Sequence, residues 1–139
     1  MRIALLCRSV VFLIIVFATQ ASAEIKITRC PLQHPDASGG RLKTAVPHET
    51  GDMSNDLPEY PPHAPGEVSI AVYEYGLPGE PIFRNAKLLC RYSMGPNLSL
   101  PVPGQLKRCE MRWREPSNPK ADPIYLSAYC ESEISGAAQ

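Results

Sequence analysis

Histidine, carboxylate and cysteine side chains are the groups in this sequence that could bind a metal or act as catalysts. Three histidines share one proline-rich stretch with three nearby acids: His34, His48, His63, Asp52, Asp56 and Glu59. His48-Glu49 matches the start of the H-E-x-x-H zinc motif, but position 52 is aspartate where that motif needs its second histidine. The chain also lacks a G-x-S-x-G nucleophile motif and a glycine-rich phosphate loop. We therefore expect no metal site, no cofactor, no catalytic residue and no enzymatic activity.

The cysteines indicate disulfides instead. Cys7 falls in a segment that we expect to be removed, which leaves Cys30, Cys90, Cys109 and Cys130. An even number of cysteines in a small exported domain predicts two disulfides, and the absence of a C-x-x-C spacing argues against zinc. Of the three possible pairings, two are favoured by symmetric chain reversals. They are Cys90–Cys109 with Cys30–Cys130, and Cys109–Cys130 with Cys30–Cys90, and the sequence leaves both open.

The N-terminus has the pattern of a secretory signal peptide. Arg2 gives a positive start, residues 10–18 are apolar, and Ala21-Ser22-Ala23 matches the small-residue cleavage site. The apolar run is too short for a membrane span. We expect residues 1–23 to be cleaved, leaving one secreted β domain over 24–139, without a membrane span, in the periplasm or outside the cell.

Basic residues are concentrated in one segment of a chain whose formal net charge is zero. Residues 84–94 and 106–114 read as the two arms of a β-hairpin, and this ribbon holds most of the basic side chains of the mature chain. The residues proposed to bind a partner are Arg91, Arg108, Arg112 and Arg114, with Tyr92 and Trp113 as aromatic anchors. An anionic partner fits this ribbon, whereas the zero net charge argues against nucleic acid. The alternative is an ordinary solvated face.

Alternating apolar and polar residues predict strands over 24–30, 67–75, 84–94, 106–114 and 123–131. In the last of these, Ile124, Leu126, Ala128 and Cys130 are expected to face inward. Residues 31–66 read as a long proline-rich irregular loop, and 132–139 as a frayed tail. No stretch has a convincing helical period. The sequence therefore predicts an all-β fold, a small antiparallel meander forming a sandwich or open barrel, held by two disulfides.

Short motifs spread along the mature chain carry a resemblance to a known family. They are Cys30-Pro31, Gly79-Glu80-Pro81, Leu89-Cys90-Arg91-Tyr92, Leu100-Pro101, Leu106, Cys109 and Tyr129-Cys130. Their order and spacing resemble those of small secreted four-cysteine proteobacterial proteins of the enteric type, whose function is not established. At the level of fold, the chain is also distantly similar to periplasmic inhibitors of C-type lysozyme, although their inhibitory loop motif has no residue-by-residue match here.

The resemblance implies a non-enzymatic periplasmic binding protein of the inhibitor or immunity type. Its partner would be a cell-wall-degrading enzyme or toxin, with the basic ribbon or the 31–66 loop as the contact. The alternative is an envelope-associated structural protein that binds an anionic polymer.

Overall fold

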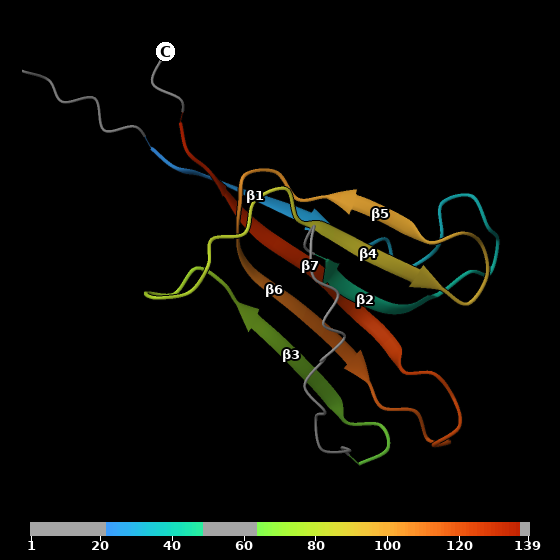
Figure 1. Ribbon diagram of the computed structural model, residues 1–139. Helices are drawn as coiled ribbons and strands as arrows, with labels where there is room; N and C mark the ends of the chain where they lie inside the picture. The colour runs from blue at the N-terminus through green and yellow to red at the C-terminus, as the bar shows by residue number, and fades with distance from the viewer. Residues whose placement is uncertain (1–21, 49–63, 137–139) are drawn as a thin grey trace, which may run out of the picture.

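The computed structural model describes residues 22–48 and 64–136, and these residues form seven strands (Figure 1). The strands are β1 (Glu24–Arg29), β2 (Leu42–His48), β3 (Val68–Glu74), β4 (Lys87–Tyr92), β5 (Leu98–Pro101), β6 (Gln105–Arg114) and β7 (Ile124–Ile134). Every strand pair is antiparallel. The prediction of an all-β fold is confirmed. Within the described ranges, no helix is long and apolar enough to cross a membrane. The predicted signal peptide lies almost wholly outside these ranges.

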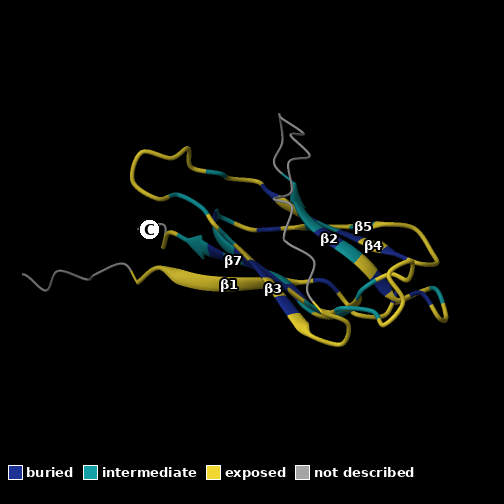
Figure 2. Ribbon diagram, turned by 90° about the horizontal axis from the view of Figure 1, so that it is seen from below, coloured by how far each residue is buried: buried dark blue, intermediate teal, exposed yellow. Residues whose placement is uncertain are grey.

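Two sheets form an open sandwich rather than a closed barrel. The larger sheet has the strand order β1-β7-β6-β3, and the smaller one has the order β2-β4-β5. Figure 2 shows the two layers, with buried segments in both of them. The core draws on both sheets, and its fully buried side chains include Leu88 of β4 and Leu106 of β6.

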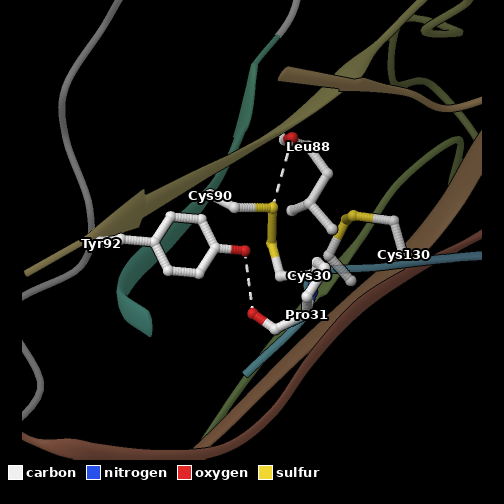
Figure 3. Close-up of a disulfide and its surroundings, with 7 residues drawn as sticks. Cys30, Pro31, Leu88, Cys90, Tyr92 and Cys130 are labelled. Atoms are coloured by element: carbon white, nitrogen blue, oxygen red, sulfur yellow. Dashed lines mark hydrogen bonds between the residues drawn. A yellow bond between two sulfur atoms is a disulfide. The ribbon is translucent and has the colours of Figure 1, made fainter. Parts of the chain in front are cut away.

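The two disulfides have different structural roles. Cys30 directly follows β1 and bonds to Cys90 of β4, so this bridge joins the two sheets (Figure 3). Cys109 and Cys130 lie directly opposite each other on β6 and β7, with Cα atoms 4.0 Å apart, so the second bridge joins neighbouring strands of one sheet. Of the two pairings that the sequence leaves open, the structure has Cys30–Cys90 with Cys109–Cys130. Cys90 Sγ lies 3.8 Å from the Leu88 carbonyl oxygen, which is a close contact without a proton, since a disulfide sulfur carries none.

The predicted hairpin between residues 84–94 and 106–114 is wrong. β4 pairs with β2 and β5, whereas β6 pairs with β3 and β7, so the two arms belong to different sheets. One isolated bridge between Arg84 and Gln105 joins them. The reason is the tight turn after β4, where Gly95 adopts a φ of 90° and returns the chain at once into β5. β5 therefore occupies the position beside β4 that the prediction gave to β6.

Two expected irregular segments contain strand residues. β2 lies inside the 31–66 segment and pairs with β4, although Pro47 and the scarcity of apolar residues hide its strand pattern. Residues 49–63 of that segment lie outside the described part of the chain. β7 continues to Ile134, which places the start of the expected 132–139 tail within the large sheet.

The facing of β7 differs from the prediction at one end. Ala128 and Cys130 are buried as expected, but Ile124 and Leu126 are exposed. A β-bulge explains the difference. The register shifts between Arg112 and Trp113, and one extra residue on β7 reverses the alternation beyond that point.

Candidate functional site

The sequence-predicted binding residues divide between the two sheets of the sandwich. Arg91 and Tyr92 belong to β4 in the small sheet, whereas Arg108, Arg112, Trp113 and Arg114 belong to β6 in the large sheet. Arg91 follows the buried Cys90 in the alternation of β4 and therefore points away from the core on the small-sheet side. The six residues do not form one surface.

Three of the predicted arginines do lie together on the outer face of the large sheet. Arg108, Arg112 and Arg114, here called the basic row, alternate along β6 with side chains that point toward the core. The predicted strand over 106–114 is therefore confirmed, with one face toward the core and one charged face. Register places the basic row opposite β3 on one side and β7 on the other.

Glu110 organises the basic row. Its carboxylate accepts a hydrogen bond from Arg108 Nη2 at 2.7 Å and another from Arg112 Nη2 at 3.4 Å. Arg108 also lies 3.8 Å from Glu131 on β7. The Glu110 side chain is only 11% exposed, whereas the Arg108 and Arg112 side chains that bond to it are 35% and 46% exposed. Glu110 thus orients two positive groups toward solvent on a rigid strand.

An exposed aliphatic stripe runs beside the basic row. Val68, Ile70 and Val72 of β3 are 44%, 47% and 40% exposed. They lie directly opposite Arg114, Arg112 and Glu110, so they share the outer face. The sequence shows that these three residues share one face of their strand, but their apolar character hides that this face is the solvent-exposed one. The opposite face carries the small, buried Ser69 and Ala71.

The two predicted aromatic anchors do not lie on this surface. Trp113 packs beside Tyr125 with ring centroids 6.0 Å apart, and its indole N–H donates to Glu115 Oε1 at 2.7 Å. Tyr92 is 7% exposed, and its hydroxyl donates to the Pro31 carbonyl at 2.8 Å (Figure 3). Burial raises the pKa of the Tyr92 phenol. Tyr92 therefore links β4 to the segment that follows β1, and Trp113 packs against the core from the large sheet.

A cleft of about 280 Å³ opens where the start of β7 lies beside β2. Arg41, Lys43 and Tyr125 line it, and Lys43 Nζ forms an ion pair with Asp122 at 3.2 Å across it. Burial raises the pKa of Tyr125, against the opposing effect of hydrogen bonds with Thr44 and Ala45. No sequence motif reveals this cleft, because Arg41 and Lys43 are far from Tyr125 in the chain. Within the described residues, Arg41 has no ion-pair partner, so it adds positive charge to this cleft.

His34, one of the candidate metal ligands, has a structural role. Its Nδ1 accepts a hydrogen bond from the Asp36 amide, so Nε2 carries the proton and donates to the Pro96 carbonyl at 3.0 Å. The buried ring also packs edge-on against Tyr92. Among the described residues, no three His, Cys, Asp or Glu side chains gather as metal ligands would. His63, Asp52, Asp56 and Glu59 lie outside the described ranges.

Comparisons with known proteins return no relative. No protein-family model, no curated protein and no solved structure matches the chain.

Proposed function

We propose that this protein is a non-enzymatic extracytoplasmic binding protein that docks an acidic protein surface. The observation that carries the proposal is the basic row of β6 beside the aliphatic stripe of β3 on one outer face. Arginine is enriched at protein interfaces, and contiguous exposed apolar side chains in a soluble domain mark interaction surfaces.

The chemistry of the surface favours carboxylates on the partner. Arg108 and Arg112 are held in place by Glu110, so little side-chain entropy is lost when a planar carboxylate binds them. The aliphatic stripe supplies apolar area next to these charges. This combination favours a folded protein over a purely anionic polymer, which would have no apolar surface to place against Val68, Ile70 and Val72.

The cellular compartment that the disulfides indicate limits which partners this protein could meet. The two disulfides indicate an oxidising, extracytoplasmic environment. Together with the expected signal peptide, this supports a periplasmic or secreted protein. Glycosidases that cleave cell-wall polymers carry paired carboxylates in an open cleft, which is complementary to an arginine row. We therefore infer an inhibitor or immunity-type protein that acts on a cell-wall-degrading enzyme, in keeping with the sequence resemblance to secreted four-cysteine proteins.

The test is inhibition of peptidoglycan hydrolysis by a panel of purified cell-wall glycosidases. We expect the oxidised protein to inhibit at least one of them at a 1:1 ratio, less strongly as salt rises. The Arg108→Gln/Arg112→Gln variant removes two charges but keeps groups that can hydrogen-bond to Glu110. Its inhibition should weaken at least about tenfold, since losing two charge-assisted contacts costs more than about 1.4 kcal/mol.

Lys87→Gln/Arg91→Gln is the matched control. It removes two charges from β4, in the small sheet, and inhibition should stay unchanged. Equal loss in both variants would show a general charge effect and contradict docking on the large sheet. If no glycosidase is inhibited and the protein instead sediments with peptidoglycan until salt releases it, the alternative of a polymer-binding envelope protein holds.

A further inference from the structure

The edge strands of the two sheets differ in how they are protected against pairing with another chain. Lysine and proline are the residues that commonly protect a sheet edge. β1 carries Lys26, β2 carries Lys43 and Pro47, and β5 has only four residues and includes Pro101. β3 has neither residue type along Val68–Glu74, and it forms the end of the large sheet in the described part of the chain (Figure 1).

The register of β3 shows which of its backbone groups point toward the open edge. Glu115 N–H donates to the Glu67 carbonyl and Tyr75 N–H to the Lys107 carbonyl, both at 2.9 Å. In an antiparallel pair, alternate residues bond to the same neighbour. The odd-numbered residues of β3 therefore bond to β6. The N–H and C=O groups of Val68, Ile70 and Val72 point outward, and these residues also form the aliphatic stripe.

We propose that β3 pairs antiparallel with β3 of a second copy of this chain, about a two-fold axis at Ile70. The segment Val68–Val72 reads V-S-I-A-V, which is close to palindromic in size and polarity. Pairing about Ile70 sets Val68 opposite Val72 of the second copy, and it brings outward-pointing backbone groups onto outward-pointing ones. The small Ser69 and Ala71 meet on the inner face. The aliphatic stripes of the two copies become one continuous apolar band.

Charge complementarity between the two copies also supports the register centred on Ile70. The same two-fold axis sets Glu74 opposite Gly66 of the second copy. Arg114 Nη1 donates to the Gly66 carbonyl at 3.3 Å, so its guanidinium lies at that position on the same outer face. Each Glu74 carboxylate therefore comes next to Arg114 of the other copy, and symmetry makes this ion pair twice. The result is one eight-stranded sheet with a basic row on each side of the apolar band.

The test is the mass of the oxidised mature protein in solution, measured by light scattering and sedimentation over a concentration series. We expect twice the protomer mass at high concentration and a concentration-dependent return to monomer. A protein that stays monomeric up to about 1 mM would overturn the proposal.

Two sets of variants test the register. Ile70→Lys should weaken dimerisation at least tenfold, whereas Ile27→Lys, which alters an exposed isoleucine on the β1 edge of the same sheet, should leave it unchanged. Glu74→Arg and Arg114→Glu should each weaken the dimer, and the double variant should restore it. Recovery of the dimer in the double variant would show that the single variants lost the ion pair and not their fold. A dimer that is insensitive to Ile70→Lys and to both charge changes would place the interface elsewhere and contradict the proposal.

Discussion

Cys30 and Cys90 connect the two sheets of the sandwich across a sequence separation of 60 residues. Cys109 and Cys130 are separated by 21 residues and connect strands that already pair. The first bridge therefore joins two layers that are otherwise held by side-chain packing and by only a few hydrogen bonds, such as that from Thr28 to the Pro101 carbonyl. The second reinforces a hydrogen-bonded ladder.

We predict that the inter-sheet bridge contributes more to stability than the bridge within the sheet. From loop closure alone, Cys30→Ala/Cys90→Ala should lower the free energy of unfolding by about 4 kcal/mol, and Cys109→Ala/Cys130→Ala by about 3 kcal/mol. Urea denaturation of the two variants measures both values. Retention of the full midpoint after complete reduction of the natural protein would contradict this prediction.

A second prediction concerns Gly104, in the turn before β6. Its φ is +74°, and a Cβ at this position would lie against the carbonyl of Glu133 on β7. Gly79 has a φ of +88° and no atom within 4 Å of the place that a Cβ would occupy, so it is the matched control. Both alanine variants incur the left-handed backbone cost of about 1 kcal/mol, and Gly104→Ala should lose about 1–3 kcal/mol more from overpacking. Equal melting temperatures of the two variants would show that the turn at Gly104 accommodates a Cβ without loss of stability.

The hydroxyl of Ser132 leads to a stabilising prediction. Ser132 is fully buried on β7, and its Oγ has no hydrogen-bond partner in the described part of the protein. Ser132→Ala removes this buried polar group and leaves a side chain of similar size, so the variant should be about 1 kcal/mol more stable. Thermal unfolding of the pair checks the sign. A destabilised alanine variant would show that the hydroxyl is satisfied in solution.

Alkaline pH should destabilise the fold through two tyrosines. Burial raises the pKa of Tyr92 and Tyr125 above the ordinary value of 10.0. Above pH 10.0, the unfolded chain loses phenolic protons that the folded protein retains, so stability falls as pH rises toward the folded pKa values. Well below pH 10.0, these two groups contribute no pH dependence.

Urea unfolding across an alkaline pH series measures this slope. Tyr92→Phe/Tyr125→Phe should flatten it, while losing about 2 kcal/mol at neutral pH, about 1 kcal/mol for each hydroxyl whose hydrogen bonds are removed. If the double variant has the same dependence of unfolding free energy on pH, groups other than these two tyrosines cause the loss of stability at alkaline pH.

The strands were predictable from the sequence where side chains alternate in polarity, as Cys109, Met111 and their charged neighbours do on β6. Which strands pair with one another was harder to predict. The symmetric spacing of Cys90 and Cys109 suggested a hairpin, but the turn at Gly95 sends the chain into β5 instead. A symmetric spacing is compatible with two residues lying opposite each other, but the local turn geometry determines whether they do.

The candidate surface was half predictable. Three arginines of β6 follow from a period of two, and they do lie together. Arg91 shares their charge but belongs to the other sheet, which no local pattern reveals. The facing of Val68, Ile70 and Val72 was not predictable either, because β3 buries its small residues and exposes its branched ones. On the buried face of β3, the Ser69 hydroxyl donates a hydrogen bond to Glu115 Oε1, so this small polar residue is satisfied there.

The native bridges pair these four cysteines consecutively along the chain, the first with the second and the third with the fourth, as Cys30–Cys90 and Cys109–Cys130. A polypeptide that enters an oxidising compartment N-terminus first exposes its thiols in that same order. An oxidase that transfers its own disulfide to each pair as it emerges, and is itself reduced, would reach the native connectivity without rearranging a non-native disulfide. Maturation of this protein would then require an oxidase but no disulfide isomerase.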